Sequence, residues 1–270
     1  MDNGEYKVAE GIEYLIFGKG YIGTYLSEHL PNSYLCDTRV EFEPDIGFPI
    51  KNYKPRCVIN CIGKTGNPNV DWCEDHKEET FFANVTIPTF MSSLCEKYGS
   101  HFINLGTGCV FESDTPLDDD AKPNFFGSFY SRTKAMVEEL LLEDKLATTI
   151  RIRMPASSID SQKNILTKIS KYDNVTDIPN SITLLDDLVK AIPFIVNKEM
   201  YGTINLTHPH NTSIANLKSI MQQEYKVVGQ EDLGIGARSN TLLTSRRMLD
   251  KGFEFSPFEE TIKRYSKDLK

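Results

Sequence analysis

Apolar residues fall into two alternating patterns along the first part of the chain. Short apolar runs typical of buried strands lie at 14–17, 33–36, 57–62, 101–107 and 148–155. Apolar positions at helical spacing follow the first run as far as residue 30, and recur over 78–98 and 128–144. Strands that alternate with helices predict a parallel sheet covered on both faces. We therefore expect an α/β fold with a Rossmann-type, doubly wound parallel sheet.

The pattern changes after Pro155. Stretches with helical spacing lie at 161–172, 184–198, 213–225 and 257–269. One clear strand, GTINLT at 202–207, interrupts them. We predict a dinucleotide-binding Rossmann domain over 1–155 and a smaller, mostly helical substrate-binding lobe over 156–270, with chain segments free to interleave between the two.

Composition and charge exclude several classes of protein. Of the 270 residues, 40% are hydrophobic and 25% are charged, which is typical of a soluble globular protein. No apolar run reaches the roughly 18 residues of a membrane helix, and the acidic, polar N-terminus does not look like a secretion signal. The net charge of −8, with no basic block, argues against a nucleic-acid partner. We expect a cytoplasmic protein that binds neither membranes nor nucleic acids.

The six cysteines all lie in the first 110 residues, at positions 36, 57, 61, 73, 95 and 109. A disulfide scaffold would be shorter and denser in cysteine, so reduced thiols are expected. Cys57 and Cys61 lie roughly 13 Å apart if their strand stays extended, which is too far to share a metal ion. We predict no metal site.

A glycine motif follows the first strand. The sequence GKGYIG at 18–23 fits the pattern GxGxxG and opens a helix, as a dinucleotide-binding loop does. Its glycines allow a tight turn and let backbone N–H groups approach a pyrophosphate. The pattern alone also occurs in plain turns, but in this context we assign cofactor contacts to Gly18, Gly20, Tyr21, Ile22 and Gly23.

The second strand ends in CDTR, which holds two residues with opposite preferences. An acidic residue such as Asp37 would bind the ribose 2′-hydroxyl of NADH, whereas Arg39 would bind the 2′-phosphate of NADPH. Because Arg39 can reach a phosphate while Asp37 caps a turn, we expect NADPH as the cofactor and keep NADH as the alternative.

A second motif, YSRTK at 130–134, places Tyr130 and Lys134 four residues apart and hence on one face of a helix. An ammonium group beside a phenol favours the phenolate and lowers the pKa of the tyrosine towards working pH. Thr107 lies between the two motifs, at the end of a strand. A solvated Tyr-Lys pair is the alternative to a catalytic one.

This set of residues resembles the extended short-chain dehydrogenase/reductase family, whose working trio is Ser or Thr, Tyr and Lys. The likeness is greater to the nucleotide-rhamnose synthase epimerase-reductases, and it extends from the first strand through GARSN at 236–240. The segments that carry it are GNPNVDWCEDH (66–76), LGTGCVFE (105–112), PNFFGSFYSRTKAMVEELL (123–141), RIRMPASS (151–158), NILTKI (164–169) and DIPNSIT (177–183).

The resemblance implies a role for each candidate catalytic residue. Thr107 would hydrogen-bond the reacting oxygen, Tyr130 would exchange its proton, and Lys134 would hold the phenol and the cofactor ribose. In a 4-keto-6-deoxy-glucose nucleotide, the C–H bonds at C3 and C5 are acidic because they adjoin the C4 ketone. Cys109 would be the base that removes these protons and Lys168 the acid that returns them. Taken alone, Cys109 as a packing residue and Lys168 as a solvated helix position stay open.

The implied function is a bifunctional 3,5-epimerase and NADPH-dependent 4-ketoreductase that converts UDP- or dTDP-4-keto-6-deoxy-D-glucose to the nucleotide-L-rhamnose. A monofunctional 4-dehydrorhamnose reductase and a non-catalytic, reductase-like regulatory subunit are the alternatives. A separate 4,6-dehydratase would supply the substrate. Homodimerisation through the helices at 78–98 and 128–144 is expected by analogy with the family.

The remaining assignments also follow from the resemblance. Further cofactor contacts are expected at Cys61, Gly63 and Pro155. Substrate contacts are expected at Glu112, Asn164 and Arg238, of which the last two would hold the diphosphate unless they are plain surface residues. The glycine loop is one residue shorter than the family's GxTGxxG, which affects the phosphate contacts, and the acidic segment 113–122 is shorter than in plant relatives, which affects the roof of the substrate cleft.

Overall fold

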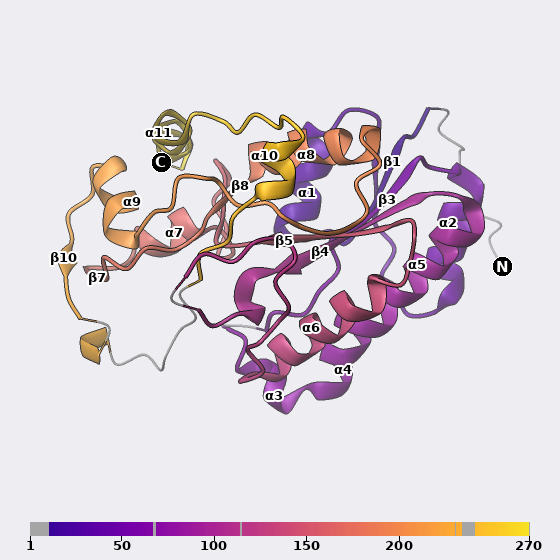
Figure 1. Cartoon of the computed structure of the whole chain (residues 1–270), viewed down its shortest axis with the longest axis horizontal. Coiled ribbons are helices and arrows are strands. Elements are labelled where there is room, and N and C mark those ends of the chain that lie inside the picture. The colour runs from indigo at the N-terminus through magenta and orange to yellow at the C-terminus, as the bar shows by residue number, and fades with distance from the viewer. Residues whose placement is uncertain (1–10, 67–68, 114, 230, 234–240, 270) are drawn as a thin grey trace.

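A six-stranded parallel sheet runs through the molecule in the order β2-β1-β3-β4-β5-β9 (Figure 1). The computed structural model describes residues 11–66, 69–113, 115–229, 231–233 and 241–269. The strands are β1 (Tyr14–Phe17), β2 (Ser33–Cys36), β3 (Cys57–Asn60), β4 (His101–Thr107), β5 (Ala147–Ile152) and β9 (Gly202–Asn205). The predicted Rossmann-type sheet is confirmed.

The carboxyl ends of the strands meet at one edge of the sheet, because all neighbouring strands are parallel. Phe17 of β1 is in register with Asn60 of β3, and Asn60 with Asn104 of β4. Strand β4 continues three residues beyond Asn104, so its last residue, Thr107, projects past the end of β3. Thr107 is in register with Ile152 of β5, so it lies at the end of the sheet between β3 and β5.

Helices cover both faces of the sheet (Figure 1). The core on one face includes α1 (Tyr21–His29) and α8 (Leu185–Asn197). The core on the other face includes α2 (Glu43–Tyr53), α5 (Ile87–Tyr98) and α6 (Phe129–Leu141). Consecutive residues of β1 enter different cores, Leu15 the second and Ile16 the first, and both are fully buried. Apolar residues on both faces of a strand are the signature of a covered parallel sheet.

The helix predicted over 78–98 is helical throughout but not uniform. It consists of α4 (Lys77–Phe81), a π-helical turn (Phe82–Thr86) and α5. Helix α2 was not predicted, because its sequence EPDIGFPIKNY carries two prolines and a glycine that weaken the helical pattern. The prolines are tolerated because Pro44 lies in the first turn and Pro49 packs in the core.

The C-terminal part forms a third core, shared by α7 (Ile165–Ile169), α9 (Ile214–Ile220) and α11 (Phe258–Asp268). Its short elements were not predicted, because elements of two to five residues leave no periodic signal. The short strands are β6 (Pro155–Ala156), paired with β8 (Thr183–Leu184), and β7 (Asn174–Val175), paired with β10 (Lys226–Val227), and the short helix is α10 (Arg246–Asp250). The two parts interleave, since β9 from the second half of the chain forms the edge strand of the Rossmann sheet and α8 packs in the core on one of its faces.

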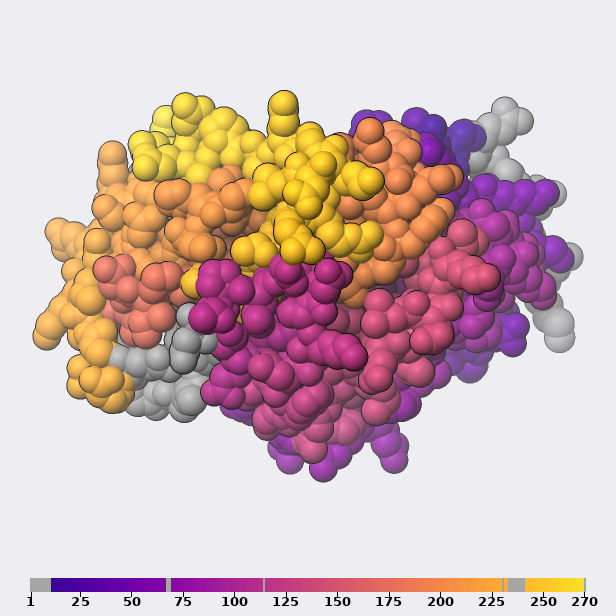
Figure 2. Space-filling view, in the orientation of Figure 1, coloured from indigo at the N-terminus to yellow at the C-terminus, as the bar shows by residue number. Residues whose placement is uncertain are grey.

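A roof segment, residues 115–122, lies against the C-terminal part of the chain (Figure 2). The backbone of Leu117 exchanges hydrogen bonds with Leu242 and Thr244, and Arg246 pairs with Asp118 at 3.0 Å. Within the described residues, no helix is long and apolar enough to cross a membrane. The same residues contain no cluster of three or more His, Cys, Asp or Glu side chains suited to a metal ion.

Candidate active site

The turn between β1 and α1 forms a cradle in which two positions require glycine. Gly18 has a φ of +101°, and a Cβ added there would lie 2.7 Å from the carbonyl carbon of Cys61. A Cβ on Gly23 would lie 2.0 Å from the carbonyl oxygen of Gly18. Gly20 caps α1, and a Cβ there would meet no atom within 4 Å. The first N–H groups of α1 therefore remain open to an anion, and the turn fits the pyrophosphate of a dinucleotide.

Tyr21 links this turn to the C-terminal part of the chain. Its hydroxyl shares a hydrogen bond of 2.8 Å with Ser157 Oγ, and burial raises the pKa of Tyr21. Ile22 and Cys61 pack beside it against the core on the α1 face. Pro155 begins β6, two residues before Ser157, and is half-buried. These contacts bring the predicted cofactor residues Tyr21, Ile22, Cys61 and Pro155 to one end of the sheet.

Lys19 of the glycine turn adds a positive charge beside the residues that follow β2. The Lys19 ammonium pairs with the Asp37 carboxylate at 2.7 Å. Arg39 is almost fully exposed and lies 3.4 Å from Glu41. The Asp37 carboxylate is thus paired with Lys19, and the Arg39 guanidinium is paired with Glu41 at the exposed surface. Sequence reasoning missed Lys19 because it occupies a variable position of the glycine motif.

Asn84 holds the loop after β3 in place. Its Oδ1 accepts a hydrogen bond from the Lys64 backbone N–H at 2.8 Å, and its Nδ2 donates to the Lys64 carbonyl at 3.1 Å and to Thr133 Oγ1 at 3.2 Å. Gly63, a predicted cofactor contact, directly precedes Lys64 in this loop and is exposed. Asn84 was also missed, although a polar residue within an apolar helical pattern was a usable signal.

Thr107 and Tyr130 meet at the end of β4. A side-chain hydrogen bond joins their hydroxyls, and Thr107 Oγ1 also accepts the Cys109 N–H at 3.1 Å. Burial raises the pKa of Tyr130, and the neighbouring Cys109 adds to the rise, while the Thr107 hydrogen bond and the charge of Arg153 oppose it more weakly. The predicted lowering of the Tyr130 pKa is wrong for this structure, because burial of the phenol outweighs every nearby favourable contact.

Lys134 lies one turn along α6 from Tyr130. Its ammonium donates to the Leu105 carbonyl at 2.7 Å. Burial lowers the pKa of Lys134 to about 8, and the nearby Glu138 carboxylate opposes that change. The lysine is therefore tied to the backbone of β4, close to the Thr107 end, rather than exposed on a solvated helix face.

Cys109 sits in a short 3-10 turn (Gly108–Val110) directly after β4. The Ser131 hydroxyl of α6 donates to the Cys109 carbonyl at 3.0 Å, which holds the turn against the helix. The Cys109 sulfur accepts a hydrogen bond of 2.9 Å from Nη1 of Arg153. Arg153 was not among the predicted site residues, although its segment RIRMPASS was part of the resemblance.

Of the predicted substrate residues, Asn164 has a different role. It caps α7, accepts the Leu166 N–H at 3.1 Å, and donates to the carbonyls of Ser157 and Ile159 at 2.8 Å each. Its side chain is fully buried, so the expected contact with the diphosphate does not fit. Lys168 is half-buried near the C-terminal end of the same helix, and its approach to the Cys109 side of the cleft stays a prediction.

Glu112 and Arg238 are the other two predicted substrate residues. Glu112 is exposed just beyond the Cys109 turn, where its backbone N–H donates to Asn124 Oδ1 at 2.9 Å and its carbonyl accepts from Asn124 Nδ2 at 3.0 Å. Its contact with the substrate stays a prediction. Arg238 lies outside the described residues.

Comparison with known proteins identifies the family. The family model described as the RmlD substrate binding domain matches residues 45–189. The chain belongs to this family. The part of the chain matched by the RmlD model includes Thr107, Cys109, Tyr130, Lys134 and Lys168. The predicted family relationship is therefore confirmed.

Two curated proteins from Arabidopsis thaliana are similar to this chain over almost its whole length. A bifunctional dTDP-4-dehydrorhamnose 3,5-epimerase/dTDP-4-dehydrorhamnose reductase is 35% identical, over 94% of this chain and 92% of its own length. A trifunctional UDP-glucose 4,6-dehydratase/UDP-4-keto-6-deoxy-D-glucose 3,5-epimerase/UDP-4-keto-L-rhamnose-reductase is also 35% identical. The match covers 97% of this chain but only 43% of that longer protein.

Solved structures support the RmlD fold over almost the whole chain. The L780 UDP-rhamnose synthase of Acanthamoeba polyphaga mimivirus superposes with a TM-score of 0.84 at 28% identity, over 94% of this chain and 98% of that chain. The dTDP-4-dehydrorhamnose reductase of Bacillus anthracis, solved in complex with NADP, gives 0.78 at 19% identity, over 93% and 97% of the two chains. The second likeness concerns the fold alone.

Proposed function

We propose that the protein is a bifunctional 3,5-epimerase and NADPH-dependent 4-ketoreductase that converts UDP- or dTDP-4-keto-6-deoxy-D-glucose to the nucleotide-L-rhamnose. The observation that carries the proposal is the position of Cys109: its backbone N–H donates to Thr107 Oγ1 at 3.1 Å, and its side chain lies close enough to Tyr130 to raise the pKa of the phenol. A ketoreductase needs the two hydroxyls but has no use for a thiol beside them. The Arabidopsis and mimivirus relatives named above support the substrate class.

In the reduction, Thr107 and Tyr130 hydrogen-bond the C4 ketone oxygen, and Tyr130 gives it a proton. NADPH, when bound, supplies the hydride to C4. Because burial raises the pKa of Tyr130, the phenol stays protonated before the reaction and is available as the acid. Lys134 supplies a positive charge on the same side of α6, which stabilises the phenolate left behind.

In the epimerisation, the Cys109 thiolate removes a proton from C3 or C5, and Lys168 returns a proton on the opposite face of the ring. The negative charge moves to the C4 oxygen, which the hydroxyls of Thr107 and Tyr130 already hold. One oxyanion site therefore serves both steps. A monofunctional reductase, the second candidate, would use Thr107, Tyr130 and Lys134 and leave Cys109 unused.

NADPH is the preferred cofactor in this proposal, with NADH as the alternative. The cradle formed by Gly18, Gly20 and Gly23 accepts the pyrophosphate, and its shape serves either cofactor. Arg39 and Lys19 add positive charge beyond β2, where a 2′-phosphate would lie.

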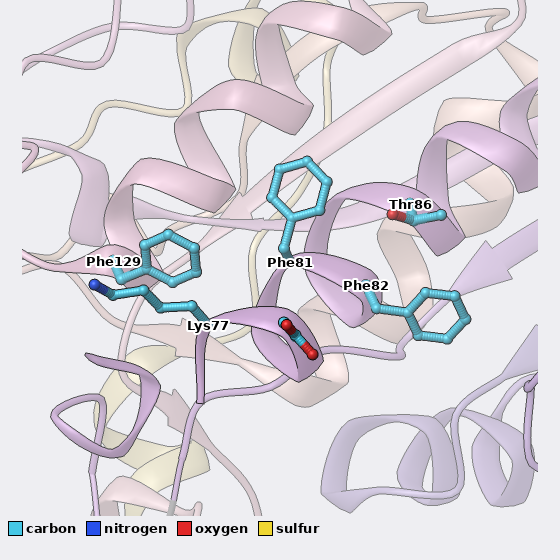
Figure 3. Close-up of a pocket in the computed structure, with 6 residues that line it drawn as sticks. Lys77, Phe81, Phe82, Thr86 and Phe129 are labelled. Carbon is cyan, nitrogen blue, oxygen red and sulfur yellow. The ribbon is translucent and has the colours of Figure 1, made fainter. Parts of the chain in front are cut away.

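Two partners belong to the proposal. A 4,6-dehydratase, separate or joined to a longer chain as in the trifunctional relative, supplies the keto sugar. A second copy of this chain packs against α4, the π-helical turn and α6. An open cavity of about 540 Å³ on that face is lined by Lys77, Glu78, Phe81, Phe82, Thr86 and Phe129 (Figure 3). Opposite charges beside exposed aromatic rings suit an interface that is complementary to itself.

The test of the proposed function is proton exchange in D2O. Wild type and Cys109→Ser are incubated with UDP-4-keto-6-deoxy-D-glucose, with and without NADPH, and the products are analysed by NMR. We expect wild type to incorporate deuterium at C3 and C5 without NADPH and to form UDP-rhamnose with it, whereas Cys109→Ser loses the exchange. Reduction of a pre-epimerised sugar without any exchange would make the protein a plain reductase. Failure with both the UDP and the dTDP sugar would favour a regulatory subunit.

A further inference from the structure

Cys109 and Arg153 form a contact that the reduction does not require. Nη1 of Arg153 lies 2.9 Å from Cys109 Sγ and donates a hydrogen bond to it. The arginine is 8% exposed, whereas the cysteine is half-buried. The guanidinium carries a permanent positive charge, and a thiolate accepts its hydrogen bond more strongly than a neutral thiol does.

The arginine is held in this position from two directions. Its Nε donates to Oδ1 of Asn180 at 3.0 Å. Its backbone exchanges hydrogen bonds with Thr183, through Thr183 Oγ1 at 3.0 Å and the Thr183 N–H at 2.7 Å. Asn180 is itself fixed, because its backbone forms two hydrogen bonds with Thr212, at 2.8 and 3.0 Å. The guanidinium therefore has little freedom to leave the sulfur.

The backbone next to Arg153 is strained. Met154 has a φ of +40°, in the left-handed region that a residue with a side chain rarely adopts. This turn redirects the chain between the end of β5 and the start of β6. Strained residues persist only where surrounding contacts hold them, and they occur often at functional sites.

We propose that Arg153 is a positioning residue for epimerisation, which pairs with the Cys109 thiolate while Asn180 orients the guanidinium. The inference rests on the proposed function, in which Cys109 is the base. In the step, the thiolate takes the C3 or C5 proton and becomes a thiol, the C–H electron pair forms the C=C bond of the enolate, and the carbonyl π pair moves to the C4 oxygen. The guanidinium keeps all its protons throughout, so its charge is present before and after the step.

The neighbours of Cys109 support this pairing. Among the described residues, Arg153, directly after β5, donates to the sulfur, and Tyr130, from α6, is a charge neighbour of Cys109. Tyr130 stays neutral because burial raises its pKa. Cys61 is the other half-buried cysteine, and there burial raises the pKa to about 12. Since no cation among the described residues contributes to that shift, Cys61 serves as an internal reference thiol.

The experiment measures the rate at which iodoacetamide alkylates Cys109, by peptide mass spectrometry, between about pH 6 and pH 10, where thiols become thiolates. Wild type is compared with Arg153→Met and Arg153→Lys, and Cys61 is followed in the same samples. We expect Arg153→Met to slow alkylation of Cys109 about tenfold near pH 7 and to approach the wild-type rate near pH 10, with Arg153→Lys in between. Alkylation of Cys61 should not change.

Two results would overturn the pairing. In the first, Cys109 of Arg153→Met is alkylated within about twofold of the wild-type rate at every pH. In the second, its alkylation is slower than wild type by the same factor at every pH up to 10, which indicates that the reagent reaches Cys109 less easily rather than that a charge was lost. The alkylation assay needs no sugar substrate. If it gives the expected result while wild type shows no deuterium exchange, the pairing stands and the proposed epimerase function fails.

Discussion

The Lys134 ammonium donates a hydrogen bond of 2.7 Å to the backbone carbonyl of Leu105, two residues before Thr107. This contact fixes α6 to β4 at the point where both carry reactive groups. It also removes the lysine from water, and burial lowers the pKa of Lys134 to about 8. The positive charge of Lys134, which the proposed reduction uses, is therefore lost as the pH rises through about 8.

The first prediction concerns that pH dependence. Because the pKa of Lys134 is depressed to about 8, the ammonium form predominates below this pH and is lost as the pH rises through it. We expect kcat/KM for reduction of the keto sugar to fall about tenfold per pH unit above roughly pH 8. Lys134→Arg keeps its charge to much higher pH, so the fall should disappear in any activity it retains. An identical fall in both proteins would assign the titration to another group.

The second prediction separates folding from cofactor binding in the glycine turn. In Gly23→Ala the new Cβ would lie 2.0 Å from the Gly18 carbonyl oxygen, so we expect a loss of about 1–3 kcal/mol in the free energy of unfolding without any ligand. In Gly20→Ala the Cβ meets no atom within 4 Å, so stability should be preserved while NADPH binding weakens. Urea unfolding and fluorescence titration measure the two effects. Equal unfolding curves for wild type and Gly23→Ala would contradict the clash.

Much of the sheet could be predicted because its signal is local. YLIF and HFINLGT form strands with the bounds expected from their apolar runs, since a buried parallel strand must be apolar on both faces. Helix α2 and the two-residue strands were missed because prolines, a glycine and short length remove the periodicity. Tertiary contacts set these elements instead.

The candidate site likewise contains residues that local motifs predict and residues that only tertiary contacts bring into place. Thr107, Tyr130 and Lys134 belong to motifs with fixed spacing, and the structure brings them to one place. Arg153 belongs to no motif of fixed spacing. Its contact with Cys109 joins residues 44 positions apart, so it depends on the fold and not on local sequence. The direction of the Tyr130 pKa was mispredicted for a related reason: burial depends on the whole fold, whereas the lysine four residues away is visible in the sequence.

The third prediction tests the cofactor preference. Arg39 is almost fully exposed beyond β2, so its removal should not disturb the fold. We expect Arg39→Ala to raise the KM for NADPH about tenfold and to leave the KM for NADH within about twofold, because the 2′-phosphate loses a charge-assisted hydrogen bond. Lys51→Ala, an exposed change on α2, serves as the control. Equal effects on both cofactors would show that Arg39 does not distinguish them.

The fourth prediction concerns the buried ion pair that supports the roof segment. Arg151 and Glu138 are 2% and 4% exposed and are joined by bidentate hydrogen bonds. Arg151 also donates to the carbonyls of Asp119 and Ala121 at 3.2 and 2.7 Å, so the pair connects α6 and β5 to the roof segment. Removing one partner leaves a buried charge without compensation.

We therefore expect Glu138→Gln to lower the free energy of unfolding by about 3–5 kcal/mol, measured by urea denaturation. Glu139→Gln, at the exposed neighbouring position of α6, should change it by less than about 0.5 kcal/mol. The double variant Arg151→Met/Glu138→Leu should recover much of the loss, because it removes both charges and keeps apolar volume. A double variant as unstable as Glu138→Gln would mean that the hydrogen bonds to the roof segment, rather than charge compensation, stabilise this region.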